Sequence, residues 1–482
     1  MIKEVRTRFA PSPTGYMHVG NLRTAIFEYL IAKVNNGKFI LRIEDTDQKR
    51  FVEGATELMY KTLKQAGIFH DEGPDVGGNY GPYIQSQRKD LYIKYAEGLV
   101  AKGDAYYCFC TKERLEILKD DLGNMKYDRH CLSMSKEAIE THLNNGDSFV
   151  IRQKMPTEGS TTFNDMIYGD ITIDNKELED QIMIKSDGFP TYNFANVIDD
   201  HLMEISHVVR GNEYITSTPK YNLLYDALGW DKPTYVHVPL IIGDDGKKLS
   251  KRNGDASFED LISEGYISEA IVNYIALLGW SPGNEREFFT MKELEEAFNY
   301  NNISKSPAVF DKNKLTWMNG ELIKRMSDED FCVLVKPFLK KAIKIENIDL
   351  DKVARLLKSR TEVLNDDIIH KVAFLETLPD YDVEIYTHKK MKTDSAISLT
   401  SLKEAYKVLE SLEDWTELSI HDSLINLVGV LGIKNSQLLW PVRTAISGLQ
   451  VSPGGAIEIA EILGKNETLI RINVGIEKLE EK

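Results

Sequence analysis

The segment spanning residues 8–21 carries side chains whose types and spacing suit chemistry on a phosphate group. It is a Pro- and Gly-containing loop between an alternating apolar run and a helical pattern that begins at Leu22. At such a turn, backbone N–H groups and the helix N-terminus can hold phosphate. The loop matches neither GxGxxG nor a Walker sequence. Thr14 and His18 could instead stabilise a pentacoordinate phosphorus, with a nucleotide base over Gly20. A capped surface loop is the alternative interpretation.

A second candidate segment, residues 247–252, holds four cations in six positions within a Gly- and Asp-rich loop. Phosphoryl and adenylyl transfer need little covalent help, so positioning and cations supply most of the rate. A loop of this kind could close over a triphosphate, with Lys251 neutralising charge on the departing pyrophosphate. The alternative is a solvated basic loop, as most charge runs are.

The two segments together resemble the signature pair of class I aminoacyl-tRNA synthetases. The first two thirds of the chain resemble one family of that class densely, the bacterial-type glutamyl-tRNA synthetases, and the rest resembles it loosely. The stretches that carry this resemblance are Arg8–Asn21, Arg42–Asp47, Asp71–Asp75, Gly81–Tyr83, Ser186–His201, Arg210–Gly211 and Lys248–Arg252. The implied fold is α/β: a doubly wound, Rossmann-like catalytic domain with an α+β insertion, followed by all-α C-terminal bundles.

The resemblance also implies a reaction, the ATP-dependent ligation of L-glutamate to the 3′ end of tRNA(Glu). Glutamate attacks the α-phosphate of ATP to give glutamyl-adenylate and pyrophosphate, and the tRNA ribose then displaces AMP. We expect Mg²⁺ on the ATP phosphates, because Mg²⁺ favours phosphates and water over a protein cage. The implied catalytic residues are Thr14, His18 and Lys251. The implied ATP-binding residues are His18, Gly20, Asn21, Glu213, Lys248, Ser250 and Lys251.

Carboxylate recognition favours arginine, because a guanidinium binds both oxygens in a fixed geometry. Arg8 and Arg210 each end a predicted strand, and the carboxyl ends of parallel strands line the ligand crevice. The glutamate pocket that the resemblance implies comprises Arg8, Ser12, Glu44, Tyr192, Asn196 and Arg210. Glu44 suits the α-ammonium group, whereas Asn196 could equally be a hydrogen-bonding residue of helix packing. We expect Asp45 and Asp47 to cap the next helix and pair with Arg50.

Three of the four cysteines are clustered and could place thiolates on one zinc ion. They are Cys108, Cys110 and Cys131, with Tyr127 or His130 available as a fourth ligand. The zinc-bearing members of the family have Cys-x-His at the second pair, which Ser133 breaks here, and Tyr127 matches an alternative Cys/Cys/Tyr/Cys arrangement. The other possibility is an insertion that folds without metal around reduced cysteines.

The composition is that of an ordinary globular protein of 482 residues, with 42% hydrophobic residues and a net charge of −16. The sparse cysteines favour a reducing, cytoplasmic setting, and no apolar run is long enough to predict a membrane span. The acidic total argues mildly against nucleic acid, so a tRNA-binding chain must gather its cations on one face. We expect a monomer.

Periodicity supplies the elements that position these residues. We predict strands at 5–10, 39–43, 149–152, 171–173, 207–209 and 236–242, and helices at 22–34, 53–66 and 219–228, with a capping box at Thr290 and Glu293. The expected domains are 1–90, the first half of the catalytic domain; 91–190, the inserted acceptor-end domain; 191–245, the second half; 246–321, a helical region that contacts the tRNA stem; and 322–482, an α-helical anticodon-binding region.

Three rival functions are less consistent with the sequence. A truncated paralogue that glutamylates an anticodon base lacks the C-terminal helical domain, and the glutaminyl enzyme usually carries a β-barrel there. A catalytically silent tRNA-binding module would not need both signature segments. Whether tRNA(Gln) is also charged depends on one anticodon base, for which Arg360 is a candidate reader, with a solvated helix cation as the alternative.

Overall fold

The computed structural model describes residues 4–50, 52–118, 127–249 and 257–481. The chain forms two compact units, an N-terminal unit of Met1–Ile262 with Ile271–Asp311 and a C-terminal unit of Ser263–Ala270 with Lys312–Lys482. Ser250 and Lys251, both predicted to contact ATP, lie outside the described residues. Within the described residues no helix is long and apolar enough to cross a membrane.

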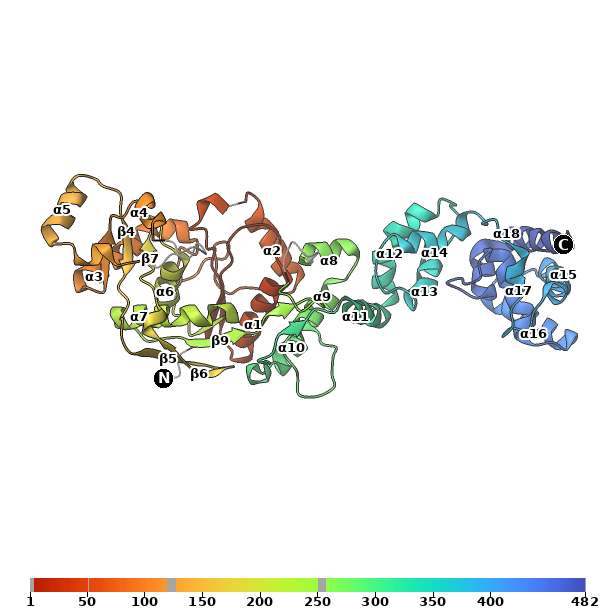
Figure 1. Ribbon diagram of the computed structural model, residues 1–482. Helices are drawn as coiled ribbons and strands as arrows, with labels where there is room; N and C mark the ends of the chain where they lie inside the picture. Colours follow the sequence, from red (N-terminus) through yellow and green to blue (C-terminus); the bar gives the residue numbers. More distant parts are fainter. Residues whose placement is uncertain (1–3, 51, 119–126, 250–256, 482) are drawn as a thin grey trace. The chain divides into compact units, whose positions relative to one another are not determined.

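Parallel strands form the centre of the N-terminal unit (Figure 1). Strand β1 (Arg6–Phe9) is buried throughout and pairs in parallel with β2 (Lys38–Leu41), and α1 (Val19–Val34) connects the two. Strand β8 (His207–Gly211) pairs in parallel with β9 (Thr234–Val238) through α7 (Thr218–Leu228). The two halves meet where the Ser206 N–H donates to the carbonyl oxygen of Arg6 at 2.9 Å. These two βαβ units confirm the predicted doubly wound fold.

The predicted strand 236–242 is wrong in one respect, because the structure divides it in two. Strand β9 ends at Val238, and a separate β10 (Ile241–Ile242) pairs with β11 (Ala308–Val309). Pro239 lies between them and has no N–H to donate to a ladder. The chain therefore changes partner strands just before the basic loop.

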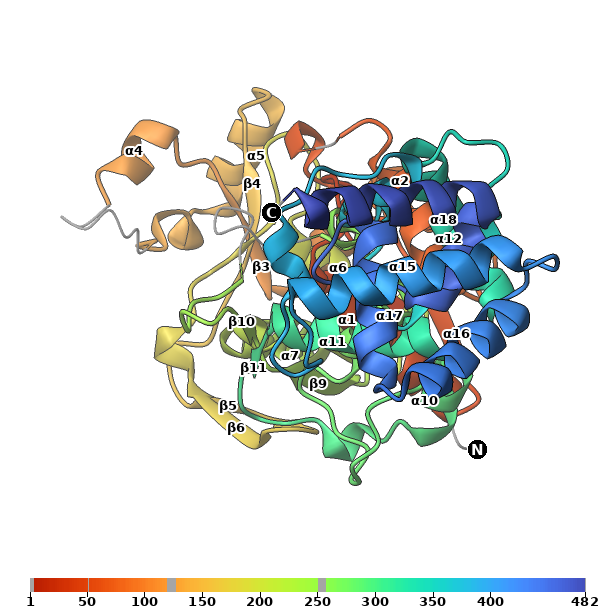
Figure 2. The ribbon, with the colours of Figure 1, turned by 90° about the vertical axis from the view of Figure 1, so that its right-hand side faces the viewer.

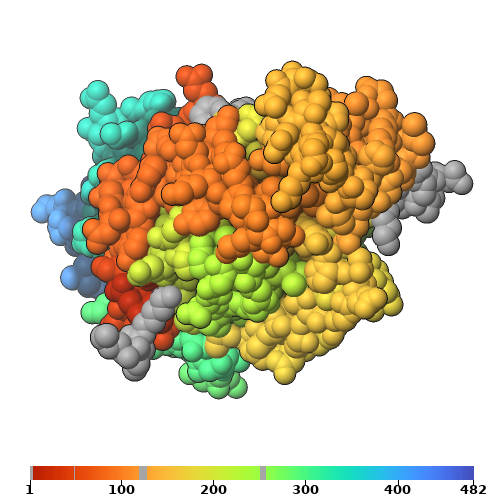
Figure 3. All heavy atoms as spheres, turned by 90° about the vertical axis from the view of Figure 1, so that its left-hand side faces the viewer, coloured from red at the N-terminus to blue at the C-terminus, as the bar shows by residue number. Residues whose placement is uncertain are grey.

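In its described residues, the insertion contains a small antiparallel sheet and the α-helices α3 (Lys89–Lys102), α4 (Lys112–Glu116) and α5 (Lys136–Asn144). Its sheet has the order β3-β4-β7, from Ala105–Cys108, Val150–Gln153 and Ile182–Ile184. Figure 3 shows these residues in orange and yellow beside the green second half of the catalytic domain.

One hairpin of the predicted insertion belongs to the catalytic sheet instead. Strands β5 (Ser160–Asp165) and β6 (Gly169–Asp174) are antiparallel to each other, and β5 meets β9 where Asp165 pairs with Tyr235. The resulting sheet has the order β6-β5-β9-β8. This pairing is long-range, and strand alternation alone does not reveal it.

Three further helices belong to the N-terminal unit: α2 (Ala55–Gln65), α6 (Tyr192–Leu202) and α10 (Met291–Ala297). Two others, α8 (Phe258–Glu264) and α9 (Ser268–Ala276), contain residues of both units. The predicted capping box is present at α10, where Thr290 and Glu293 exchange side-chain and backbone hydrogen bonds.

Helices are the regular elements of the C-terminal unit in its described residues (Figure 2). Its helices are α11 (Lys312–Arg325), α12 (Asp328–Ala342), α13 (Leu350–Lys358), α14 (Asp367–Glu376), α15 (Ser395–Ser411), α16 (Glu417–Leu431), α17 (Asn435–Ser447) and α18 (Ala456–Glu480). Buried Arg471 of α18 donates to the carbonyl oxygens of Phe374 and Ile446, at 2.7 and 2.9 Å. It thereby satisfies acceptors at the ends of α14 and α17 that lack a helical partner.

We expect Gly475→Ala to destabilise the C-terminal unit by about 1–3 kcal/mol. A Cβ at this position of α18 would collide with the hydroxyl of buried Tyr386 and lie 3.0 Å from the Cβ of Ala445. The matched control is Gly429→Ala in α16, where a Cβ meets nothing within 4 Å. That change should stabilise the helix by up to about 1 kcal/mol. Calorimetric unfolding of both full-length variants checks the pair, and equal shifts would contradict the packing at α18.

Candidate active site

A cavity of about 980 Å³ lies at the carboxyl ends of β1 and β8. It is where ligands bind in open α/β sheets. Eleven of the predicted site residues line it: Arg8, Ser12, Thr14, His18, Gly20, Asn21, Glu44, Tyr192, Arg210, Glu213 and Lys248. Asn196, one turn further along α6 than Tyr192, is buried and does not line the cavity.

The start of α1 forms part of the wall of this cavity. His18 is the N-cap of the helix, and its Nδ1 accepts the Gly20 N–H at 3.0 Å. Because Nδ1 is an acceptor, the neutral ring carries its proton on Nε2. A Cβ on residue 20 would lie 3.3 Å from His18 Nδ1, so glycine allows this close approach. The helix N-terminus and the imidazole N–H therefore both favour an anion.

The basic loop begins at the same cavity. Lys248 forms an ion pair with Glu213 at 3.2 Å, and both side chains line the cavity. The backbone fixes this position, because the Leu249 N–H donates to the Ile241 carbonyl oxygen and the Gly243 N–H donates to that of Lys247. The predicted ATP-binding residues Lys248 and Glu213 are thus neighbours in the wall of the cavity.

A buried network of charges extends behind Arg8 and Glu44 of the cavity wall. Asp200 of α6 accepts two hydrogen bonds from Arg8, at 3.0 and 3.2 Å, and one from Arg42 at 2.8 Å. Burial works to raise the pKa of Asp200, but the two guanidinium groups hold it below its ordinary value. Glu44 accepts from Arg42 at 3.0 Å, and burial raises its pKa to about 7 against that attraction.

Arg210 differs from Arg8 in its partners. Its Nε donates to His237 Nε2 at 3.1 Å and its Nη2 donates to Thr218 Oγ1 at 2.8 Å. Its guanidinium lies 4.5 Å from the ring centre of Tyr221 and 5.4 Å from that of Tyr214. None of the carboxylates in the described ranges pairs with it. Unlike Arg8, Arg210 therefore keeps its charge available for a ligand carboxylate.

A buried pair that sequence reasoning missed orients Arg210. His237 Nδ1 lies 2.7 Å from Asp165 Oδ2, and Asp165 also accepts the N–H groups of Ile167 and Tyr168. A carboxylate can only accept, so Nδ1 carries the proton and Nε2 is left to accept from Arg210. Burial lowers the pKa of His237, while Asp165 opposes that shift. Nothing in the local sequence predicts that residues 165, 210 and 237 meet. They come together because β5, β9 and β8 are neighbours in the sheet.

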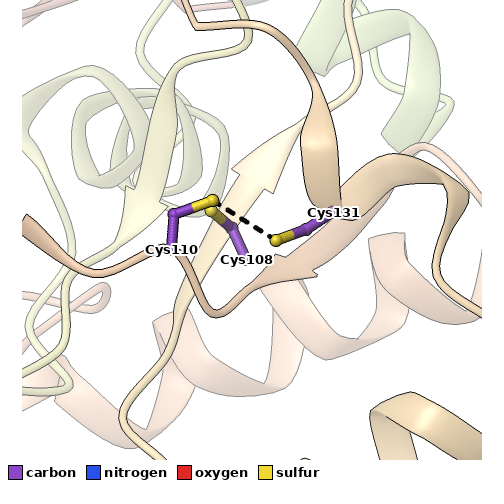
Figure 4. A group of neighbouring side chains, drawn as sticks. All are labelled: Cys108, Cys110 and Cys131. Carbon is purple, nitrogen blue, oxygen red and sulfur yellow. Dashed lines mark hydrogen bonds between the residues drawn. The ribbon is translucent and has the colours of Figure 1, made fainter. Parts of the chain in front are cut away.

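The three clustered thiols come together as predicted (Figure 4). The sulfur atoms of Cys108, Cys110 and Cys131 all lie within 4.8 Å of one another, and Cys110 and Cys131 are 3.5 Å apart. The Tyr127 hydroxyl is 3.2 Å from Cys108 Sγ, whereas His130 is exposed. Burial works to raise the pKa of Cys108, but hydrogen bonds from Tyr127 and Arg152 hold it below its ordinary value. A tetrahedral zinc ion requires sulfur atoms at this spacing.

Fold and cavity together define a class I aminoacyl-tRNA synthetase. Residues 4–317 match the family of class I tRNA synthetases (E and Q), catalytic domain, and residues 330–476 match an anticodon binding domain. The chain is 60% identical to the glutamate–tRNA ligase of Clostridium novyi (strain NT) and 58% identical to that of Clostridium acetobutylicum, with 99% of each chain covered. It belongs to the glutamate–tRNA ligase family, which confirms the resemblance seen in its motifs.

Solved structures agree with this assignment. The chain is similar to a glutamate tRNA ligase from Elizabethkingia meningosepticum that was crystallised in complex with its amino acid. The TM-score is 0.89 at 34% identity, over 99% of this chain and 100% of that one. A glutamate–tRNA synthetase from Elizabethkingia anophelis gives the same TM-score over 98% of this chain. The predicted order of catalytic domain and helical C-terminal region is confirmed.

We expect Asp165→Asn to destabilise the N-terminal unit by about 1–3 kcal/mol. An amide beside Nδ1 no longer enforces the tautomer, so an N–H on Nε2 can face the Nε–H of Arg210. The matched control is Asp170→Asn, which removes a charge from an exposed residue of the same hairpin. It should change stability by less than about 0.5 kcal/mol. Urea unfolding checks both variants, and an unchanged midpoint for Asp165→Asn would contradict the orienting role.

Proposed function

We propose that this chain ligates L-glutamate to the 3′ end of tRNA(Glu) at the expense of ATP. The supporting observation is the chemistry of one cavity. Its lining combines the N-terminus of α1 and an imidazole N–H, which suit phosphate, with Arg210, which has no carboxylate partner among the described residues. The names of its relatives point to the same reaction.

In the first step a carboxylate oxygen of glutamate attacks the α-phosphorus of ATP. The bond from that phosphorus to the bridging oxygen breaks, and pyrophosphate leaves with the electron pair. The His18 Nε2–H and the Thr14 hydroxyl donate to the oxygens of the pentacoordinate phosphorus, and the α1 dipole stabilises the same charge. Lys251 remains the predicted cation for pyrophosphate, with Lys248 and Glu213 at the base of its loop.

Mg²⁺ would serve this step by neutralising the ATP phosphates. In the described part of the chain, the cysteines are the single group of three potential metal ligands. The cavity therefore has no carboxylate cage, and the residues fit an ion held by phosphates and water.

In the second step the terminal ribose hydroxyl of tRNA attacks the carbonyl carbon of the adenylate, and AMP leaves. The C-terminal unit would bind the anticodon, because residues 330–476 match an anticodon binding domain. Arg360 is exposed just beyond α13, and its guanidinium Nη1 donates to the carbonyl oxygen of Ser452, which holds the end of the side chain against the segment before α18. Its anticodon-reading role remains a prediction.

The direct test is aminoacylation with purified tRNA(Glu), ATP and radiolabelled glutamate. We expect charging that depends on all three. Purified tRNA(Gln) in a parallel reaction shows whether the second tRNA is also a substrate. Absence of charging with tRNA(Glu) would reject the proposal.

We expect Arg210→Ala to raise the KM for glutamate by roughly 10- to 100-fold, with little change in the KM for ATP. A buried charge-assisted hydrogen bond contributes about 1.5–3 kcal/mol, and each 1.4 kcal/mol corresponds to about a factor of ten. Arg286→Ala is the matched control, because Arg286 is paired with Glu293 and does not line the cavity. Steady-state charging of tRNA(Glu) gives both constants. An unchanged KM for glutamate would assign Arg210 a structural role.

We also propose that the insertion binds one zinc ion through Cys108, Cys110, Cys131 and Tyr127. Cys131→Ser should lose the metal found by elemental analysis of the wild-type protein, because three ligands bind zinc more weakly than four. The control is Cys332→Ser, a buried thiol in the C-terminal core, which should retain it. A chelator should lower the melting temperature of the wild type and not of Cys131→Ser. A metal-free wild type with reactive thiols would show that the insertion folds without zinc.

A further inference from the structure

A second carboxylate faces Arg8 from α1. Glu28 is 1% exposed and lines the cavity, yet neither signature motif includes it. Its Oε1 lies 3.3 Å from Arg8 Nη1, and its Oε2 has no hydrogen-bond partner among the residues that the structure describes. A buried carboxylate oxygen without a hydrogen-bond donor lowers the stability of the fold, so its retention at Glu28 indicates a role in function.

The partners of Arg8 differ in geometry. Asp200 accepts from two nitrogens of Arg8 at once, whereas Glu28 accepts from one nitrogen at the longest distance of the three. Bidentate pairs are the stronger ones. Glu28 is therefore the partner that a ligand can replace at Arg8 with the least disruption.

The charges around Arg8 point the same way. The groups that act on Glu28 are Arg8 from β1, Asp200 from α6, and Arg42 and Glu44 after β2. Two carboxylates, Asp200 and Glu28, already contact the guanidinium of Arg8. A carboxylate of glutamate that approaches Arg8 is repelled less when Glu28 is protonated.

We infer that Glu28 is a displaceable counter-ion: a carboxylate of bound glutamate takes its place at Arg8 Nη1, and Glu28 takes up a proton from solvent. This inference rests on the proposed function. Burial raises the pKa of Glu28 well above its ordinary value, and the approach of a substrate carboxylate raises it further. Glutamate binding should then become weaker as the pH rises through the pKa of Glu28 in the free protein.

Titration calorimetry of glutamate in buffers of different ionisation enthalpy measures the proton directly. We expect uptake of up to one proton per glutamate bound, largest at a pH between the pKa of Glu28 in the free protein and its higher pKa in the complex. The KM for glutamate in tRNA charging should rise by up to about tenfold per pH unit above the pKa of Glu28 in the free protein. A wild type that takes up no proton at any pH would overturn the inference.

The discriminating variant is Glu28→Gln, which keeps the shape and an oxygen acceptor for Arg8 but cannot ionise. It should bind glutamate as tightly as the wild type at mildly acidic pH and more tightly at alkaline pH, with proton uptake lost. Persistence of the wild-type pH dependence would place the titration at Glu44 instead and overturn the assignment. Weaker binding at every pH would show that ionised Glu28 attracts the substrate ammonium group, which also overturns it.

Glu295→Gln is the matched control. Glu295 accepts from the hydroxyl of Tyr29, the residue next to Glu28, at 2.5 Å, and it does not line the cavity. Its pH profile should equal that of the wild type. Failure of the proposed function is distinguishable, because a protein that charges no tRNA gives no KM at all. A protein that charges tRNA with a pH-independent KM rejects the Glu28 inference alone.

Discussion

The buried carboxylate of Asp200 is the constraint on which the wall of the cavity around Arg8 depends. It holds Arg8 of β1 and Arg42 after β2 against α6, and all three side chains are at most 4% exposed. Two guanidinium groups in this position would repel each other without the carboxylate between them. Breaking such a buried pair typically costs about 3–5 kcal/mol. One side chain thus joins two strands and a helix behind the cavity and also fixes the orientation of the Arg8 guanidinium.

The local features of the site could be predicted from sequence, because each depends on residues close together in the chain. The sequence predicts His18 in the loop at the helix entry, and the structure places it at the N-cap of α1, which begins three residues before the predicted Leu22. The cysteine spacing places Cys108 and Cys110 side by side. The glutamate-pocket residues came from motif likeness, and all but Asn196 line the cavity.

The carboxylate partners could not be predicted in this way. Asp200 and Arg8 are 192 residues apart, and His237 and Asp165 are 72 apart. A motif specifies which residue types are present, but only the strand order shows which of them pair. The same limit explains why the sequence predicts Arg8 as a free carboxylate-binding guanidinium, although it is already paired with Asp200 in the fold. It also explains the misplaced β5–β6 hairpin, whose pairing with β9 is not encoded in its own alternation.

The residues on either side of positions 250–256 attach the basic loop to the cavity wall. Leu249 lines the cavity, and on the other side Ser257 forms a backbone bridge with His18 while the Phe258 N–H donates to the Met17 carbonyl oxygen. The chain that follows the loop is therefore tied through its backbone to the N-cap of α1. A displacement of either segment is transmitted to the other without a side chain in between.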